Sequence, residues 1–192
     1  MPGLWIVAGP NGSGKSTLTA SIGRGRIDNL IDPDAIARRL SPEDPARSAI
    51  AAGREAILQC RLLLQQRESF VVETTMSGNG TITMMRQARA AGYRISVVYI
   101  ALKYPEYNIE RVQTRVAEGG HDVPDDDIRR RFARSLAQAP IAAKLAHKAL
   151  AIDNGGLRPR RVLLFRNGRV IWEADDLPVW ACELRDAVEA AL

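Results

Sequence analysis

The chain has 192 residues, 27 basic and 22 acidic side chains, a net charge of +5 and 46% hydrophobic residues. This length and hydrophobic content suffice for one domain with its own core, so folding needs neither disulfides nor a structural metal. The two cysteines, Cys60 and Cys182, are far apart and lack a CxxC spacing, so we expect reduced thiols in a cytosolic protein. No apolar run approaches the roughly 20 residues of a membrane span, and the first strand begins too early for a signal peptide.

Short apolar runs alternate with helical patterns along most of the chain. We expect strands at 4–9, 26–32, 69–75, 93–102 and 147–154. We expect helices from near Lys15 onward and at 33–40, 46–68, 81–92, 105–118 and 125–147. Residues 161–174 are typical of a β-hairpin that turns at Asn167-Gly168, and a last helix should cover 178–191. This alternation predicts an α/β fold, a parallel sheet flanked by helices, within a single domain over 1–192.

A phosphate-binding loop is the most specific motif of the chain. Residues 9–17 read GPNGSGKST and match G-x-x-x-x-G-K-[ST] at every position, between a predicted strand and a predicted helix. Lys15 would reach the β- and γ-phosphates, and the Ser16 hydroxyl would bind Mg²⁺. The pattern therefore predicts a P-loop NTPase that uses ATP and Mg²⁺. The residues expected to surround the nucleotide are Gly9, Pro10, Asn11, Gly12, Ser13, Gly14, Lys15, Ser16 and Thr17.

The reaction class is not decided by this loop, because GTPases, motor ATPases and small-molecule kinases share it. A motor ATPase usually has an apolar strand that ends in Asp-Glu, and no predicted strand here ends so. The sequence also lacks an NKxD-type guanine-recognition motif. These two observations favour phosphoryl transfer to a bound acceptor over hydrolysis.

Carboxylates follow two of the predicted strands. IDPD (31–34) comes directly after the second strand, at the sheet edge where the phosphate loop should lie. Asp34 is our candidate for the general base that takes the proton of an acceptor hydroxyl, whereas helix capping explains Asp32 at least as well. Glu73 ends the run FVVETT, where it would orient a Mg²⁺-bound water or the acceptor, or simply mark a strand end.

Arginines cluster between residues 111 and 134. Arg111 and Arg115 lie at i and i+4, and Arg129, Arg130, Arg131 and Arg134 follow beyond the break GGHDVP, which contains His121. Arginines that close over a transferred phosphate lower the barrier, so the two helices are expected to form a lid. Each arginine could instead pair with a nearby acid on a solvated surface. His147 is expected to be structural, and no His/Cys/Asp spacing suggests zinc.

With these residues assembled, the chain resembles the zeta toxin family, particularly its short bacterial branch. The resemblance extends from the first residue to about 154. The motifs that carry it are GPNGSGKST, LIDPD with the following AIAR, GREAI (53–57), FVVETT, IERVQTRVAEGGHDVP (109–124) and IRRRFARS (128–135). The phosphate loop is common to many families, whereas ETT together with the RV…GGH-x-VP…RR segment is much more specific.

The resemblance implies a nucleotide-kinase-like fold that transfers the γ-phosphate of ATP to the 3′-hydroxyl of UDP-N-acetylglucosamine. By position, it implies Asp34 as general base and Arg111 as a contact of the transferred phosphate. It places Asp32, Glu55, Glu73, Thr74 and Thr75 on the side of the sugar nucleotide. A second family arginine aligns with His121, so its role falls to His121, Arg129 or Arg130. An antitoxin protein is the partner that the resemblance implies.

Two other readings remain open at this point. A metabolic kinase for another small acceptor would share the phosphate loop and the Asp base. A nucleic-acid-associated ATPase would use the arginine-rich segment 111–134, and its binding would depend on salt. The second reading is disfavoured because acids are interspersed with these arginines and no aromatic platform accompanies them.

Overall fold

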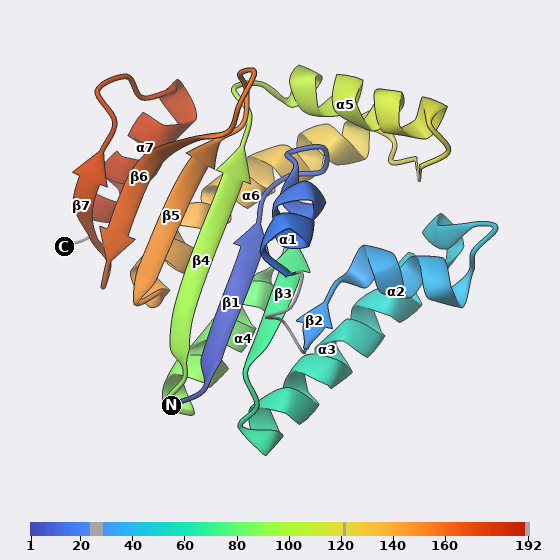
Figure 1. Ribbon diagram of the computed structural model, residues 1–192, viewed down its shortest axis with the longest axis horizontal. Coiled ribbons are helices and arrows are strands. Elements are labelled where there is room, and N and C mark those ends of the chain that lie inside the picture. Colours follow the sequence, from blue (N-terminus) through green and yellow to red (C-terminus); the bar gives the residue numbers. More distant parts are fainter. Residues whose placement is uncertain (24–28, 121, 191–192) are drawn as a thin grey trace.

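The computed structural model describes residues 1–23, 29–120 and 122–190. Within these ranges, one sheet has the strand order β2-β3-β1-β4-β5-β6-β7 (Figure 1). The strands are β1 (Gly3–Ala8), β2 (Leu30–Ile31), β3 (Phe70–Thr74), β4 (Arg94–Ala101), β5 (Lys148–Asp153), β6 (Arg160–Arg166) and β7 (Arg169–Glu173). The helices are α1 (Lys15–Gly23), α2 (Pro33–Leu40), α3 (Ala49–Gln66), α4 (Asn79–Ala90), α5 (Pro105–Ala117), α6 (Asp125–Leu145) and α7 (Val179–Glu189), with a 3₁₀ turn at Pro45–Ser48.

The sheet is parallel from β2 to β5 and antiparallel at β6 and β7. The predicted α/β fold with flanking helices and a C-terminal hairpin is therefore confirmed. The hairpin turns at Asn167 and Gly168, whose φ angles of 50° and 74° are the positive values that both central residues of a type I′ turn require. The start of the predicted second strand, 26–28, lies outside the described residues.

Strand β1 is the centre of the fold. Its neighbours are β3 and β4, so the chain order reverses on either side of it. In open α/β sheets, ligands bind beyond the carboxyl ends of the strands at such a switch point. The loop that follows Ala8 lies there, and it is the predicted phosphate loop.

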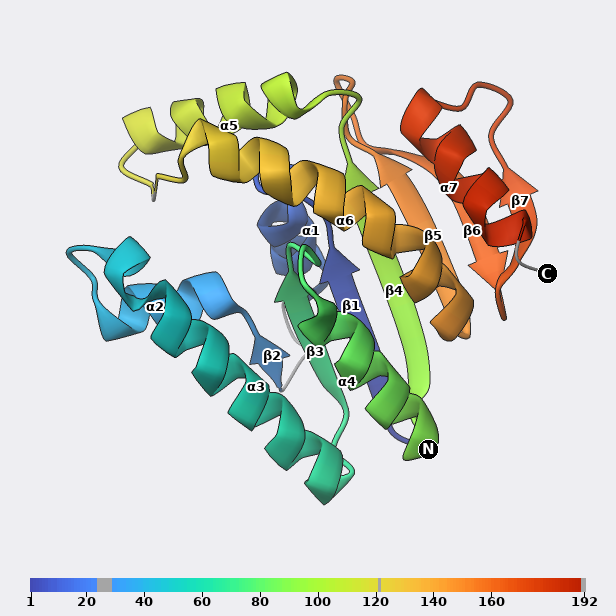
Figure 2. The same cartoon turned by 180° about the vertical axis from the view of Figure 1, so that it is seen from behind.

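The main core lies between the sheet and the helices α3, α4, α6 and α7, which Figure 2 shows on one side of the strands. Leu4, Ile6 and Ala8 of β1 point into this core and are almost fully buried. A smaller cluster of Val7, Val71, Ile100 and Ile152 fills the opposite face, where Leu18 of α1 packs against it. This alternation is what a strand with both faces covered requires.

The long helical pattern predicted at 46–68 is divided in the structure. Asp44 accepts a hydrogen bond from the backbone N–H of Arg47 and so caps the 3₁₀ turn, and α3 starts only at Ala49. Arg67 ends α3 in the left-handed conformation, with φ of 57°. None of the helices in the described ranges is long and apolar enough to cross a lipid bilayer.

Candidate active site

The phosphate loop connects β1 to α1, and its glycines are required by the geometry around it. Gly12 and Gly14 have φ angles of 73° and 96°, in the region that residues with a side chain rarely adopt. A Cβ atom at Gly12 would collide with the backbone carbonyl of Asn108, and one at Gly14 with the side-chain amide of Asn154. The loop is thus held between α5 and the segment after β5, and it can present its backbone N–H groups to a phosphate.

Lys15 is the buried cation of the site. Its Nζ donates a 3.0 Å hydrogen bond to the backbone carbonyl of Pro10, within the loop itself. Burial lowers the pKa of Lys15, although Glu73, Asp34 and Asp32 oppose this shift. A phosphate beside the ammonium group would offset the cost of burying it, so the site fits an anionic ligand.

Ser16 and Glu73 form the oxygen-rich floor of the site. The Ser16 hydroxyl donates a 2.6 Å hydrogen bond to Oε1 of Glu73 at the end of β3. Burial raises the pKa of Glu73, and the bond from Ser16 and the charge of Lys15 partly oppose this rise. Hydroxyl and carboxylate oxygens are ligands that Mg²⁺ accepts. Among the described residues no group of three or more His, Cys, Asp or Glu could hold a metal alone, so Mg²⁺ would share its coordination with phosphates.

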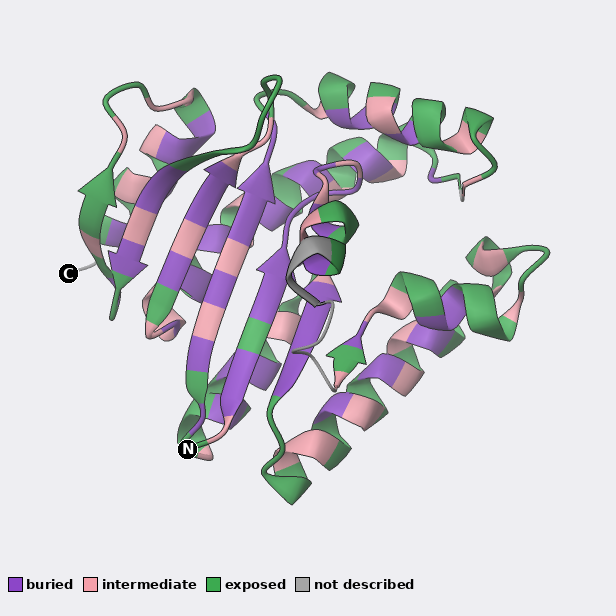
Figure 3. Cartoon of the chain, viewed as in Figure 1, coloured by how far each residue is buried: buried purple, intermediate pink, exposed green. Residues whose placement is uncertain are grey.

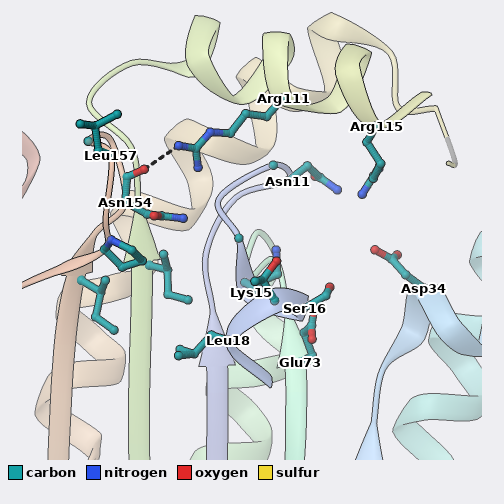
Figure 4. Close-up of a pocket in the computed structure, with 17 residues that line it drawn as sticks. Asn11, Lys15, Ser16, Leu18, Asp34, Glu73, Arg111, Arg115, Asn154 and Leu157 are labelled. Carbon is teal, nitrogen blue, oxygen red and sulfur yellow. Dashed lines mark hydrogen bonds between the residues drawn. The ribbon is translucent and has the colours of Figure 1, made fainter. Parts of the chain in front are cut away.

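A cavity of about 570 Å³ opens above this floor. Figure 4 shows Asp34 approaching it from α2 and Arg111 and Arg115 reaching down from α5, with Lys15 and Ser16 between them. Arg111 donates a 2.8 Å hydrogen bond to the backbone carbonyl of Asn154. The cavity therefore has a carboxylate on one wall and guanidinium groups on another, which matches the requirements of phosphoryl transfer.

The end of this cavity away from Asp34 is mainly apolar. It is lined by Leu18, Ile100, Ile152, Leu157 and Pro159. Asn154 lies beside them, and its amide Nδ2 donates a 2.8 Å hydrogen bond to the backbone carbonyl of Ser13. An apolar slot next to a phosphate loop is suited to the flat ring of a nucleobase.

A second cavity of about 410 Å³ lies between α3 and α4. Thr74 and Thr75 line it, together with Pro33 and Cys60. Among its lining residues in the described chain, Arg61 is the charged one, and the rest are apolar or neutral polar. Pro33 and Thr74 line this cavity, and their sequence neighbours Asp34 and Glu73 line the first one, so both cavities reach the carboxyl ends of β2 and β3.

Several of the predicted site residues lie outside both cavities. Asp32 caps α2, where it accepts a 2.9 Å hydrogen bond from the N–H of Asp34. Glu55 is paired with Arg39 on the neighbouring helix. Arg130 is exposed and forms a 2.7 Å ion pair with Asp127. His121 lies outside the described residues.

Two residues hold the phosphate loop from the lid side: Asn108, which the sequence analysis did not single out, and Arg131, which it named as one of the lid arginines. Asn108 is fully buried, and its Nδ2 donates a 2.5 Å hydrogen bond to the backbone carbonyl of Asn11. The guanidinium group of Arg131 lies 3.4 Å from Oδ1 of Asn11. It also lies 3.4 Å from Oδ2 of Asp127, with which it forms an ion pair. The sequence does contain a signal that could have identified Asn108: it is a polar residue on the apolar face of the amphipathic helix α5, three residues before Arg111.

The fold and this site together define a P-loop kinase-like domain. A protein-family model described as an AAA domain, AAA_33, matches residues 4–139, so the chain belongs to the AAA_33 family. The chain is 35% identical to an uncharacterized protein of Haemophilus influenzae over 136 residues, which cover 67% of this chain and 96% of that protein.

Two solved structures share the fold at low sequence identity. The AvrRxo1-ORF1:-ORF2 complex with ATP superposes with a TM-score of 0.71 at 15% identity, over 99% of this chain and 76% of that chain. The PezAT chromosomal toxin-antitoxin system of Streptococcus pneumoniae gives a TM-score of 0.58 at 13% identity, over 98% and 78%. Both likenesses concern the fold.

Proposed function

We propose that this protein is a kinase that transfers the γ-phosphate of ATP to a hydroxyl group of a small acceptor. The observation that carries the proposal is that both cavities lie at the carboxyl ends of β2 and β3. Asp34 and Glu73 line the cavity above the phosphate loop, and their neighbours Pro33 and Thr74 line the other. An acceptor in the second cavity would therefore place a hydroxyl between Asp34 and the bound γ-phosphate, which a simple ATPase does not need.

The proposed reaction assigns one task to each charged side chain. The Asp34 carboxylate accepts the proton of the acceptor hydroxyl as its oxygen bonds to the γ-phosphorus and the bond to the ADP oxygen breaks. Lys15 and Arg111 stabilise the negative charge on the phosphoryl oxygens. Ser16 would hold Mg²⁺ and Glu73 would orient its water ligands. The metal supplies charge neutralisation on the β- and γ-phosphates.

The finer proposal concerns the acceptor. The motifs shared with zeta toxins support UDP-N-acetylglucosamine, with Thr74 and Thr75 facing the amino sugar. The same motifs support an antitoxin protein as partner and the cytoplasm as location, where ATP and UDP-sugars are both present. The likeness in fold to a chain of the PezAT toxin-antitoxin system is consistent with this proposal.

A second candidate is a kinase for an uncharged hydroxyl compound. Arg61 is the charged residue among those lining the second cavity in the described chain. A UDP group carries two phosphates, which proteins usually bind with several cationic or backbone donors. The scarcity of such side chains favours a neutral acceptor over a nucleotide sugar in this cavity.

The test is transfer of label from [γ-³²P]ATP with Mg²⁺ to UDP-sugars, to uncharged sugars and to nucleotides. Label on UDP-N-acetylglucosamine, lost in Asp34→Asn, supports the finer proposal. Label on an uncharged sugar alone supports the second candidate. Release of free phosphate at the same rate by both proteins, with no labelled acceptor, overturns the kinase assignment.

A further inference from the structure

The two faces of the sheet are covered unequally. On one face, α4, α6 and α7 pack against β4, β5 and β6 (Figure 2). On the other face, Figure 1 shows α1 near β1 and β3, and no described helix crosses β4, β5 or β6. Parallel strands in α/β proteins are normally buried on both faces, so the uncovered part of this sheet requires an explanation.

An aliphatic row crosses the uncovered face. Strand pairing places Val98 of β4 beside Leu150 of β5, Leu150 beside Leu164 of β6, and Leu164 beside Trp172 of β7. The three aliphatic residues are only partly buried, and Trp172 is 46% exposed. Figure 3 shows intermediate bands along β4, β5 and β6, between buried ones. The row is a continuous apolar surface three to four strands wide.

Trp5 lies in the row next to the aliphatic one, where it pairs with Ser96 of β4 and is in line with Lys148 of β5. It is 47% exposed although β1 is a central strand. A Cβ atom at Gly3 would collide with three atoms of the six-membered ring of Trp5, so the indole lies over Gly3 along the sheet surface. Glycine at position 3 thus allows the ring to lie down on the strand and to present its outer face to solvent.

A positively charged row lies beside the aliphatic one. Pairing places Lys148 next to Arg166, and Arg166 next to Arg169, and all three are exposed. None of the three forms an ion pair with another described residue. The acidic strand residues lie elsewhere. Asp153 and Glu173 are on the helix-covered face, paired with Arg160 and Arg185, and Glu73 is hydrogen-bonded to Ser16 of α1.

We propose that this sheet face, defined by Trp5, Val98, Lys148, Leu150, Leu164, Arg166, Arg169 and Trp172, binds an amphipathic helix of a partner protein that carries acidic residues beside its apolar stripe. A helix is about 10 Å wide, and neighbouring strands are about 4.8 Å apart, so one helix covers the three strands that carry the aliphatic row. Glutamates on its flank would meet the basic row, which lacks intramolecular acids. The helix would supply the cover that this face of the sheet lacks.

Other occupants fit this face less well. A nucleic-acid strand needs aromatic platforms for successive bases, and the residues that precede Trp172 in its row, Val98, Leu150 and Leu164, are aliphatic. A second copy of the chain in a twofold contact would bring its own Lys148 and Arg166 against the same surface, which opposes like charges. The proposal does not depend on kinase activity, since none of the residues that define this face lines either of the two cavities.

The test uses a designed 18-residue amphipathic peptide with a leucine stripe flanked by glutamates, and a matched peptide with lysines in their place. Binding is followed by tryptophan fluorescence and by ¹⁵N chemical-shift changes. We expect the glutamate peptide to shift the amides of β4, β5 and β6. We also expect it to bind at least tenfold more tightly than the lysine peptide, and more weakly in high salt.

Two pairs of variants make the test specific. Lys148→Glu with Arg166→Glu should reverse the preference toward the lysine peptide. Arg54→Glu with Arg61→Glu, on α3 where Ile57 and Leu58 are also exposed, should leave binding unchanged. Both pairs of variants should fold, because all four positions are exposed. Circular dichroism checks that they do.

Three outcomes overturn the proposal. One is peptide binding that the α3 variants abolish, or equal binding of the glutamate and lysine peptides. Another is a single-stranded RNA 12-mer that shifts the same amides and displaces the peptide. The third is a dimer in sedimentation that Leu150→Asp with Leu164→Asp dissociates, which would make a second copy the occupant. Transfer or binding of ATP serves as a separate measurement, so failure of the proposed kinase activity would be recognised independently.

Discussion

The hydroxyl of Ser16 in the phosphate loop donates a 2.6 Å hydrogen bond to Oε1 of Glu73, which is 57 residues further along the chain. This bond joins the first turn of α1 to the carboxyl end of β3. It places a buried carboxylate beneath the hydroxyl that we expect to bind Mg²⁺. The acidic group is kept in an environment where burial raises its pKa.

Glu73→Gln should separate stability from activity. The raised pKa means that the folded state binds this proton more tightly than the unfolded state does. Glu73 therefore lowers the stability of the wild type as pH rises above its ordinary pKa of 4.5. The glutamine variant lacks this loss, so its free energy of unfolding should exceed that of the wild type at pH 7. Turnover should fall about 10- to 100-fold, as for other residues that orient metal-bound groups.

Urea unfolding between pH 4 and 8 and steady-state kinetics with varied Mg²⁺ provide the two readings. A glutamine variant that is less stable at pH 7, or that keeps full activity at low Mg²⁺, contradicts this account of Glu73.

Asp34→Asn should abolish phosphoryl transfer and leave ATP affinity nearly unchanged, because a general base contributes about 10²- to 10⁴-fold and acts on the acceptor. Asp32→Asn is the matched control, two residues earlier on the same helix end. Asparagine caps helices as well as aspartate does, so this variant should keep both stability and turnover. Transfer assays with a fluorescent nucleotide titration compare them. Equal loss in both variants would show that the helix end matters, and not the Asp34 carboxylate.

The arginines of the lid should differ in their effects. Arg111→Ala should lower kcat about 10²- to 10³-fold with a smaller change in ATP affinity, since Arg111 lines the cavity. Arg130→Ala should change kcat and ATP affinity less than about twofold, because the exposed Arg130 side chain forms an ion pair with Asp127 and does not line the cavity. Stopped-flow and steady-state kinetics measure both constants. A large effect of Arg130→Ala would indicate that the lid closes by a rearrangement that brings Arg130 inward.

Asn108→Ala should loosen the phosphate loop. The substitution removes the donor to the Asn11 carbonyl and leaves that buried oxygen without its partner, at a cost of about 1–3 kcal/mol. Both the free energy of unfolding and the ATP affinity should fall. Saturating ATP should then restore thermal stability, because the nucleotide holds the same loop. Thermal unfolding with and without ATP is the measurement, and unchanged ATP affinity would show that Asn108 only supports α5.

Cys60 should resist alkylation. Burial raises the pKa of its thiol to about 11, from an ordinary value of 9.0, so the reactive thiolate is about 100-fold scarcer at pH 8. Cys182 is less buried and serves as the internal comparison. Because Cys60 lines the second cavity, a true acceptor should slow its labelling further, and iodoacetamide labelling followed by mass spectrometry measures this. Rapid labelling of Cys60 that no acceptor slows argues against acceptor binding there.

Local sequence patterns were sufficient for most of the fold. The P-loop between a strand and a helix, the alternation of strands with helices and the hairpin turn at Asn167-Gly168 each depend on residues close together in the chain. Asp34 and Arg111 could also be selected from local patterns. Asp34 follows the end of a strand, and Arg111 shares a helix face with Arg115. The 3₁₀ turn before α3 was missed, although Asp44 and Pro45 are the local cap and first-turn residues that mark such a start.

Only the tertiary structure decided which charged residues meet. Arg130 and Arg131 are adjacent in sequence, yet Arg131 approaches Asn11 of the phosphate loop and Arg130 pairs with Asp127. Asn108 contacts a residue 97 positions away, and the uncovered sheet face combines residues of five strands. Such contacts depend on strand order and helix rotation. The sequence alone determined the phosphate-binding motif at the end of the first strand, because the residues that form it are contiguous.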